Sequence, residues 1–242
     1  MPDQQQPKAK GVVDIVFLMD ATGSMAPCID ALKRNVELFI DSLTISSGNN
    51  VSPVRDWRAK VVGYRDFEDS DAEPFVDSSF VREPAALKAQ LAALVAKGGG
   101  DEPESLLDAI YRVSMVGQTE KGATADDPSK WRYRSAAARV VIVFTDAPFK
   151  EKLALPEAKG GGLNDVINAV TSNRIILSVF APDLECFNKL AEIDRAEYMP
   201  VPLNGKTAQD ALKEFTADQA NFKETLKQLA ASVSKSAETP AL

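Results

Sequence analysis

Apolar runs alternate with amphipathic patterns along this chain. Largely apolar, β-branched stretches predict strands at residues 12–19, 139–144 and 175–181, and residues 57–64 are predicted to form another strand. Shorter stretches predict an exposed antiparallel edge strand at 75–80 and a further strand at 198–201. Helical periodicity predicts helices at 24–43, 84–96, 105–116, 163–173, 184–193 and 208–233. Strands alternating with helices indicate an α/β fold: a doubly wound, mostly parallel sheet with one antiparallel edge strand and helices on both faces.

The 242 residues are enough for one α/β domain, which we expect to span residues 11–235. The polar segment 1–10 is expected to form a disordered N-terminal tail, and residues 236–242 a disordered C-terminal tail. The small polar residues 46–50 predict a flexible loop. The polar stretch 117–135 predicts an excursion over the surface.

Composition excludes several classes of function. The formal net charge of -7 argues against binding to nucleic acids or anionic membranes, which requires basic surfaces. The chain has no histidine, which excludes histidine-based catalysis and histidine zinc sites. Cys28 and Cys186 form no CxxC motif and are expected to be reduced structural thiols. Since no signal sequence or membrane-spanning run is present, we expect a cytoplasmic protein.

The first strand runs directly into a loop rich in oxygen-bearing side chains. Asp20, Thr22 and Ser24 occupy alternate positions between the strand and the next predicted helix. Ligands of open parallel α/β sheets bind outside the carboxyl ends of the strands, and such oxygens suit a hard cation. A simpler alternative is that Thr22 or Ser24 caps the helix while Asp20 faces its N-terminal dipole.

Further acidic residues are predicted at the same edge of the sheet. Asp146 follows another buried strand, and a glycine-rich loop places Asp101 and Glu104 before a helix. The hydroxyls of Thr22 and Ser24 with the carboxylate of Glu104, and Asp20 and Asp146 acting through water, could surround Mg²⁺ and leave one position open. Glu104 could instead be an acid of the first helical turn. These sequence-predicted metal-site residues are Asp20, Thr22, Ser24, Asp101, Glu104 and Asp146.

The motif DATGS after an apolar strand, together with VIVFTDAP at 141–148, resembles the von Willebrand factor type A domain family. The resemblance covers about residues 12–201. It implies a metal-ion-dependent adhesion site (MIDAS) for Mg²⁺ or Mn²⁺, in which two hydroxyls bind the metal directly, a second loop adds a ligand, and an acid after the fourth strand acts through water. In this chain these positions fall on Thr22, Ser24, the 98–104 loop and Asp146.

The second loop departs from the common pattern of the family. Many members have a threonine there, whereas this chain has GGGDEPE at 98–104. The segment resembles the Asp-x-Pro-Glu loop of integrin β-subunit I-like domains and some bacterial and kinase-linked relatives, where the glutamate binds the metal. That comparison favours Glu104 as the direct ligand and Asp101 as auxiliary, and it leaves open which acid binds.

These observations predict a binding module, not an enzyme, and no catalytic residues. Its protein partner is expected to supply an Asp or Glu to the metal. The alternatives are a metal-dependent hydrolase or phosphoryl-transfer enzyme that uses the same acidic cluster, and a scaffold whose metal site is structural or empty. Arg65 and Asp66, at the end of the second strand, could contact a partner or form a structural ion pair.

The sequence does not match the motifs of several enzyme families. Aspartic proteases have Asp-Thr-Gly, but Ala21 intervenes here and the chain has no second such motif. Phosphotransferases of the haloacid dehalogenase type require Asp-x-Asp, whereas position 22 is threonine. The glycines at 98–100 lack the following Lys-Ser/Thr of a phosphate-binding P-loop.

Overall fold

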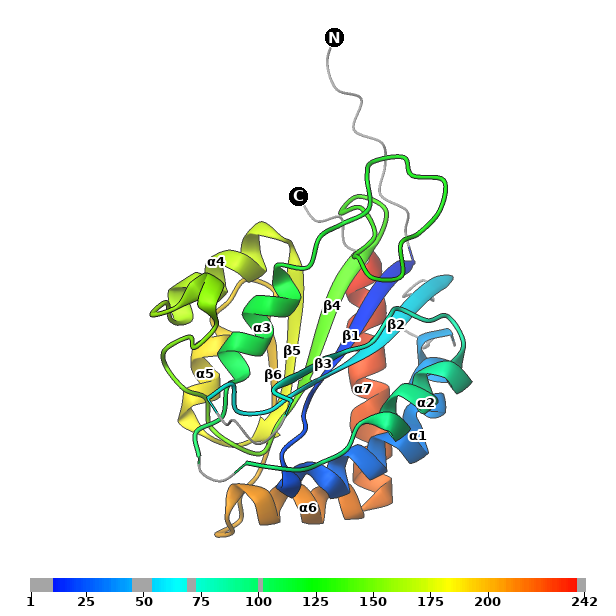
Figure 1. Ribbon diagram of the computed structural model, residues 1–242. Coiled ribbons are helices and arrows are strands. Elements are labelled where there is room, and N and C mark those ends of the chain that lie inside the picture. The colour runs from blue at the N-terminus through cyan, green and yellow to red at the C-terminus, as the bar shows by residue number, and fades with distance from the viewer. Residues whose placement is uncertain (1–10, 45–53, 69–72, 100–101, 239–242) are drawn as a thin grey trace.

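A single six-stranded sheet forms the centre of the molecule (Figure 1). The computed structural model describes residues 11–44, 54–68, 73–99 and 102–238. The strand order is β3-β2-β1-β4-β5-β6, in which β3 pairs antiparallel with β2 and every other pair is parallel. The strands are β1 (Val12–Asp20), β2 (Asp56–Tyr64), β3 (Phe75–Asp77), β4 (Ala138–Phe144), β5 (Ile175–Pro182) and β6 (Glu197–Val201). The predicted α/β fold class is therefore confirmed.

Helices cover both faces of the sheet, as Figure 1 shows. One face is covered by α1 (Ala26–Thr44), α2 (Pro84–Ala93), α6 (Ala208–Ala217) and α7 (Gln219–Glu238). The other face is covered by α3 (Leu106–Ser114), α4 (Leu163–Ser172) and α5 (Glu185–Ala191). Short 3-10 turns lie at Gly23–Met25 and Pro156–Ala158. None of the helices described is both long and apolar enough to cross a membrane.

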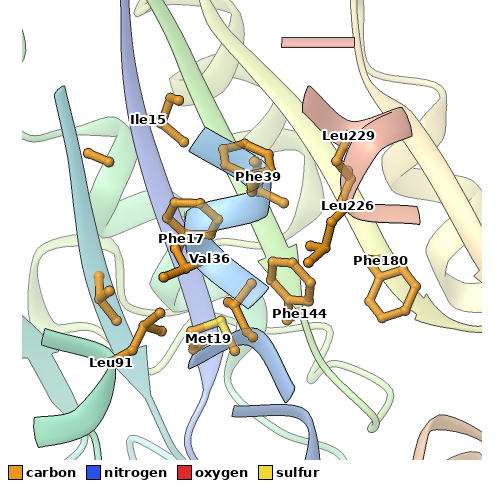
Figure 2. Close-up of a cluster of buried hydrophobic side chains, with 14 of the residues drawn as sticks. Ile15, Phe17, Met19, Val36, Phe39, Leu91, Phe144, Phe180, Leu226 and Leu229 are labelled. Carbon is orange, nitrogen blue, oxygen red and sulfur yellow. The ribbon is translucent and has the colours of Figure 1, made fainter. Parts of the chain in front are cut away.

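Aromatic side chains organise the core beneath α1 and α7 (Figure 2). The ring of Phe17 in β1 packs edge-on against Phe39 of α1, with ring centroids 5.2 Å apart, and stacks on Phe144 of β4. Alternate residues of each central strand enter the two opposite cores, so both faces of the strands are apolar. This packing fixes β1 and β4 side by side, and with them the loops that follow.

The predicted final helix, 208–233, is two helices. Helix α6 ends at Ala217, and α7 begins at Gln219 and continues to Glu238. Asp218 separates them, because its extended backbone ends α6 and its carboxylate accepts the backbone N–H groups of Ala220 and Asn221. Helix α2 likewise ends at Ala93, three residues before the predicted boundary.

The stretch 117–135 is not simply an excursion over the surface, because part of it is buried. The indole of Trp131 is fully buried and donates to the carbonyl of Val113. Arg132 reaches Asp14 in β1, with its Nε 2.7 Å from Oδ1, and Arg58 of β2 binds the same carboxylate through two nitrogens. This buried ion cluster ties the segment to the amino end of the sheet.

Both ends of the described chain meet at that same end of the sheet. The N–H of Gly11 lies 3.4 Å from the carbonyl of Ala237 and donates to it. In Figure 1 the carboxyl end of β1 and the beginning of α1 lie at the opposite end of the molecule. The predicted tail at 1–10, the predicted loop at 46–50 and residues 239–242 of the predicted C-terminal tail lie outside the described residues. Residues 236–238 of that predicted tail belong to α7.

Candidate metal site at the carboxyl edge of the sheet

Asp20 forms the buried base of the candidate site. It is the last residue of β1, and its side chain is fully buried. Oδ1 accepts the backbone N–H of Thr22 at 2.9 Å and the hydroxyl of Thr22 at 2.7 Å. Oδ2 accepts the hydroxyl of Thr145 at 2.9 Å. Asp20 is thus fixed from two loops, with Thr22 above it.

The hydroxyls of Thr22 and Ser24 lie 3.3 Å apart, in hydrogen-bond contact. Thr22 is almost entirely buried, whereas Ser24 is exposed. Although Thr22 occupies the N-cap position of the 3-10 turn, its side chain makes no capping hydrogen bond. Its hydroxyl donates to Asp20 instead, so the side chain of Thr22 is not a helix cap. Both hydroxyls retain oxygen lone pairs for a cation.

Glu104 comes from the loop before α3 and is held by its own backbone. Its N–H donates to Pro148 and its carbonyl accepts from Lys150, both at 2.9 Å. This bridge attaches the loop to the segment after β4. Since α3 begins only at Leu106, and its first-turn acid is Asp108, Glu104 is not a first-turn helix acid.

Gly99 brings Glu104 and Thr22 together. A Cβ added at Gly99 would lie 2.7 Å from Cβ of Thr22 and 3.1 Å from Oε1 of Glu104. The residue has a positive φ of 81°, which also favours glycine. Two of the predicted ligands therefore face a backbone segment that has no room for a side chain.

Two carboxylate oxygens of the site have no partner. Oε2 of Glu104 and Oδ1 of Asp146 are buried, and among the described residues no hydrogen-bond donor reaches either. Leaving a buried polar atom unpaired costs about 1–3 kcal/mol. A cation bound to Glu104 and the hydroxyls of Thr22 and Ser24 would satisfy the first oxygen, and a water on that cation could donate to Asp146, so the donor set fits a hard divalent ion.

The acids raise one another's pKa values. Burial, followed by the nearby charge of Asp20, raises the pKa of Glu104 to about 8 and that of Asp146 to about 7. Burial also raises the pKa of Asp20, against the hydrogen bonds from Thr22 and Thr145. A nearby positive charge would therefore favour the ionised forms of all three acids.

The structure brings five predicted site residues to one edge of the sheet. They are Asp20, Thr22, Ser24, Glu104 and Asp146. Asp101 lies outside the described residues. Within the described ranges, no three Asp, Glu, Cys or His side chains are grouped closely enough to hold a metal by themselves. Any metal site here therefore depends on the two hydroxyls.

Arg65 and Asp66 do not pair with each other. The guanidinium of Arg65 binds backbone carbonyls, whereas both carboxylate oxygens of Asp66 accept from Nζ of Lys150 at 2.8 Å. Asp66 also accepts the hydroxyl of Ser105, the residue after Glu104. The structural ion pair expected here is formed by Asp66 with Lys150 and not with Arg65, so each of the two neighbours supports a different loop of the site.

Sequence reasoning assigned no role to Thr145 or Lys150. Thr145 holds Asp20, and the available signal was a hydroxyl directly after the apolar strand 139–144. Lys150 pairs with Asp66 and Glu68 and lowers the pKa of Glu104 by its charge. No local sequence pattern predicts the role of Lys150, because its partners lie more than eighty residues away in sequence.

Part of the chain is similar to a known family. The family model of the von Willebrand factor A domain matches residues 14–119, which include most of β1, the DATGS loop and α3. No curated protein matches the chain.

Solved structures resemble the chain at low sequence identity. Proximal thread matrix protein 1 from the mussel byssus, with a zinc-occupied MIDAS motif, has a TM-score of 0.50 and 12% identity over 89% of this chain and 50% of that one. The pilus adhesin SpaC from Lactobacillus rhamnosus GG, in its open conformation, has a TM-score of 0.48 and 14% identity over 92% of this chain and 31% of that one. The chain thus spans a third to half of the structures it matches.

Proposed function

We propose that residues 11–238 form a von Willebrand factor A domain that binds a protein partner through a divalent cation. Thr22, Ser24 and Glu104 are the proposed direct ligands, and Asp20 and Asp146 are proposed to act through water. Asp101 keeps its proposed auxiliary role. Mg²⁺ is the proposed ion, with Mn²⁺ as its substitute, because the donors are all oxygen.

One observation carries this proposal: two buried carboxylate oxygens lack partners beside a pair of hydroxyls. Such oxygens are costly unless a cation or water satisfies them. The thread matrix protein noted above has zinc in its MIDAS motif, and this chain shares its fold. A hard cation at this edge would have one open position facing solvent, which suits an Asp or Glu of the partner.

The metal part of the proposal is tested by calorimetric titration of metal-stripped protein with MgCl₂. The Thr22→Ala/Ser24→Ala double variant is expected to abolish the binding heat. A matched control is Ser42→Ala/Thr216→Ala, which removes two hydroxyls that donate to carbonyls within helices. Equal Mg²⁺ affinity in the first variant and the wild type would contradict the assignment.

The proposed partner contact is tested by an affinity pull-down. Proteins that bind this chain in Mg²⁺ and are released by EDTA are the candidate partners. Replacing each exposed acid at the partner's interface is expected to identify one whose loss abolishes binding. Continued metal-dependent binding by all of these variants would contradict the carboxylate bridge.

The alternative of a metal-dependent hydrolase uses the same cluster to activate water. The chain supplies no histidine as a general base. Turnover of phosphoesters that requires Mn²⁺ and is lost in Glu104→Gln would favour the enzyme.

The cytoplasmic location expected from the sequence stays a prediction.

A further inference from the structure

Arg65 joins three separate segments at the candidate metal site. Arg65 is 2% exposed, and among the described residues its guanidinium donates only to backbone carbonyls. Nε contacts the carbonyls of Ala21 and Lys97, each at 3.2 Å. One terminal nitrogen binds the carbonyl of Glu73 and the other that of Val95, both at 2.6 Å. The planar fork of arginine matches this set, and an ammonium group cannot reproduce it.

Two of these segments determine where Thr22 lies. Ala21 directly precedes it, so the bond from Arg65 fixes the backbone entering the hydroxyl loop. Gly23, on the other side of Thr22, donates its N–H to the carbonyl of Gly98 at 3.0 Å. Gly99 then packs directly on Thr22. The hydroxyl loop is therefore placed against the 95–99 segment, and Arg65 is the side chain that binds both.

The charge of Arg65 also acts on the site. It attracts Asp20, and this attraction opposes the rise in the pKa of that carboxylate. Arg65 could thus support the site in two ways: through its charge, which lysine shares, or through its four carbonyl contacts, which lysine cannot make. The two are separable by experiment.

We propose that Arg65 is a positioning residue that holds the 95–99 segment against the hydroxyl loop, residues 21–24. By doing so it sets the spacing between the hydroxyls of Thr22 and Ser24 and the carboxylate of Glu104. This spacing favours Mg²⁺ over larger cations. The inference rests on the proposed function. Mg²⁺ requires near-ideal octahedral geometry at about 2.0–2.1 Å, whereas Ca²⁺ accepts looser and more numerous ligands. Loosening the clamp therefore weakens Mg²⁺ binding more than Ca²⁺ binding.

The test compares Arg65→Lys and Arg65→Gln with wild type by calorimetric titration with Mg²⁺ and with Ca²⁺. Supporting groups around metal ligands typically change affinity by about 10- to 100-fold, and we expect a rise of this size in the Kd for Mg²⁺ in both variants. The Kd for Ca²⁺ is expected to rise less. Lysine retains the charge but not the fork, so it should not rescue Mg²⁺ binding.

The matched control is Arg139→Gln. Arg139 is also a buried arginine that donates to backbone carbonyls, those of Asn173 and Arg132, but it lies at the amino end of β4. Its loss should lower the melting temperature but leave the Kd for Mg²⁺ within about twofold of the wild-type value. This result would distinguish a loss of general stability from a loss of positioning at the metal site. Circular dichroism verifies that each variant is folded at the titration temperature, and Arg65→Lys carries the test if Arg65→Gln does not fold.

Hydrogen exchange in the absence of metal separates this inference from the proposed function. The amides of Gly23 and Lys97, which link the two segments, are expected to exchange faster in Arg65→Lys, while amides in β4 are unchanged. Wild-type protein that binds neither cation would contradict the proposed function, and exchange would still decide whether Arg65 holds these segments. Unchanged exchange, a wild-type Kd for Mg²⁺ in both variants, or full rescue by lysine would each overturn the inference.

Discussion

The hydroxyl of Thr145 donates a 2.9 Å hydrogen bond to Oδ2 of Asp20, joining the loops at the carboxyl ends of β4 and β1. The other carboxylate oxygen is occupied by the N–H and hydroxyl of Thr22. With both oxygens engaged by protein donors, Asp20 is placed to orient the hydroxyl loop and to add negative charge beneath a cation. This arrangement agrees with its proposed action through water.

Asp146→Asn is expected to raise the melting temperature of the metal-free protein and to reduce the shift produced by Mg²⁺. The change removes a carboxylate that is buried beside Asp20. Free metal at 100 times Kd stabilises the wild type by about 2.7 kcal/mol, or roughly 5–10 °C for a chain of this size. Differential scanning fluorimetry in EDTA and in excess Mg²⁺ measures both effects. The control is Asp30→Asn, which changes an exposed side chain of α1. Equal Mg²⁺ shifts in Asp146→Asn and wild type would place Asp146 outside the site.

The metal-free protein should lose stability as the pH rises from about 5 to above 8. Folding raises the pKa of Asp146 to about 7 and of Glu104 to about 8, from ordinary values of 3.8 and 4.5. Between these limits the folded state binds more protons than the unfolded state, so the free energy of unfolding falls with rising pH. Urea unfolding at several pH values in EDTA measures the slope. The Glu104→Gln/Asp146→Asn variant should flatten it, and an unchanged slope would contradict the assignment.

Mg²⁺ affinity should show the opposite dependence, because the ion competes with protons for Glu104 and Asp146. Binding is expected to weaken as the pH falls below about 7 to 8, the pKa values of the two acids. Calorimetric titration at pH 6 and pH 8.5 tests this prediction. An affinity that does not change with pH would indicate that the ion binds elsewhere.

Gly99→Ala should weaken both folding and Mg²⁺ binding, because the added methyl group meets Thr22 at 2.7 Å. Gly122→Ala is the matched control: its φ is 79°, close to the 81° of Gly99, but a Cβ there meets nothing within 4 Å. The left-handed backbone alone costs a non-glycine residue about 1–2 kcal/mol. Urea unfolding and Mg²⁺ titration should show a similar or larger loss of stability for Gly99→Ala, with a change in Kd for this variant alone. Equal Kd values in both variants would count against a close fit between Gly99 and the site.

Asp14→Ala should destabilise the protein by about 3–5 kcal/mol, because it leaves the buried guanidiniums of Arg58 and Arg132 without their shared carboxylate. The Kd for Mg²⁺ should not change in the folded fraction, since the cluster lies at the amino end of the sheet. Denaturant unfolding measures the loss. Asp30→Ala, which breaks an exposed pair with Lys33, is expected to cost about 0–1 kcal/mol.

The strands and most helices were predictable because each has a local pattern of apolar and polar residues. The run ending at Asp20 and the run before Thr145 are apolar except for Asp14 and Arg139, as is typical of buried parallel strands. The break at Asp218 was missed because helical periodicity continues across it, although an Asp three residues before Asn221 is an N-cap signal. Trp131 was missed for another reason: it is an isolated tryptophan in a mostly polar stretch, and its burial depends on contacts that are distant in sequence.

The candidate site was only partly predictable. Asp20, Thr22 and Ser24 lie within five residues, so their proximity follows from one loop. Their meeting with Glu104 and Asp146 followed from the order expected for parallel strands. The partners of Arg65 and Asp66 were not predictable, because backbone carbonyls leave no residue signature and Lys150 follows a strand from another part of the sheet.

The bond between Gly11 and Ala237 places both ends of the described chain together, at the end of the sheet remote from the hydroxyl loop. Any polypeptide attached at either end leaves from the same side of the domain. If the domain were inserted into a host protein at these positions, its two junctions would lie close together, and the edge that carries the candidate site would point away from them. A circular permutant that links these ends through a short glycine-rich connection keeps that edge intact, and new ends can be opened elsewhere.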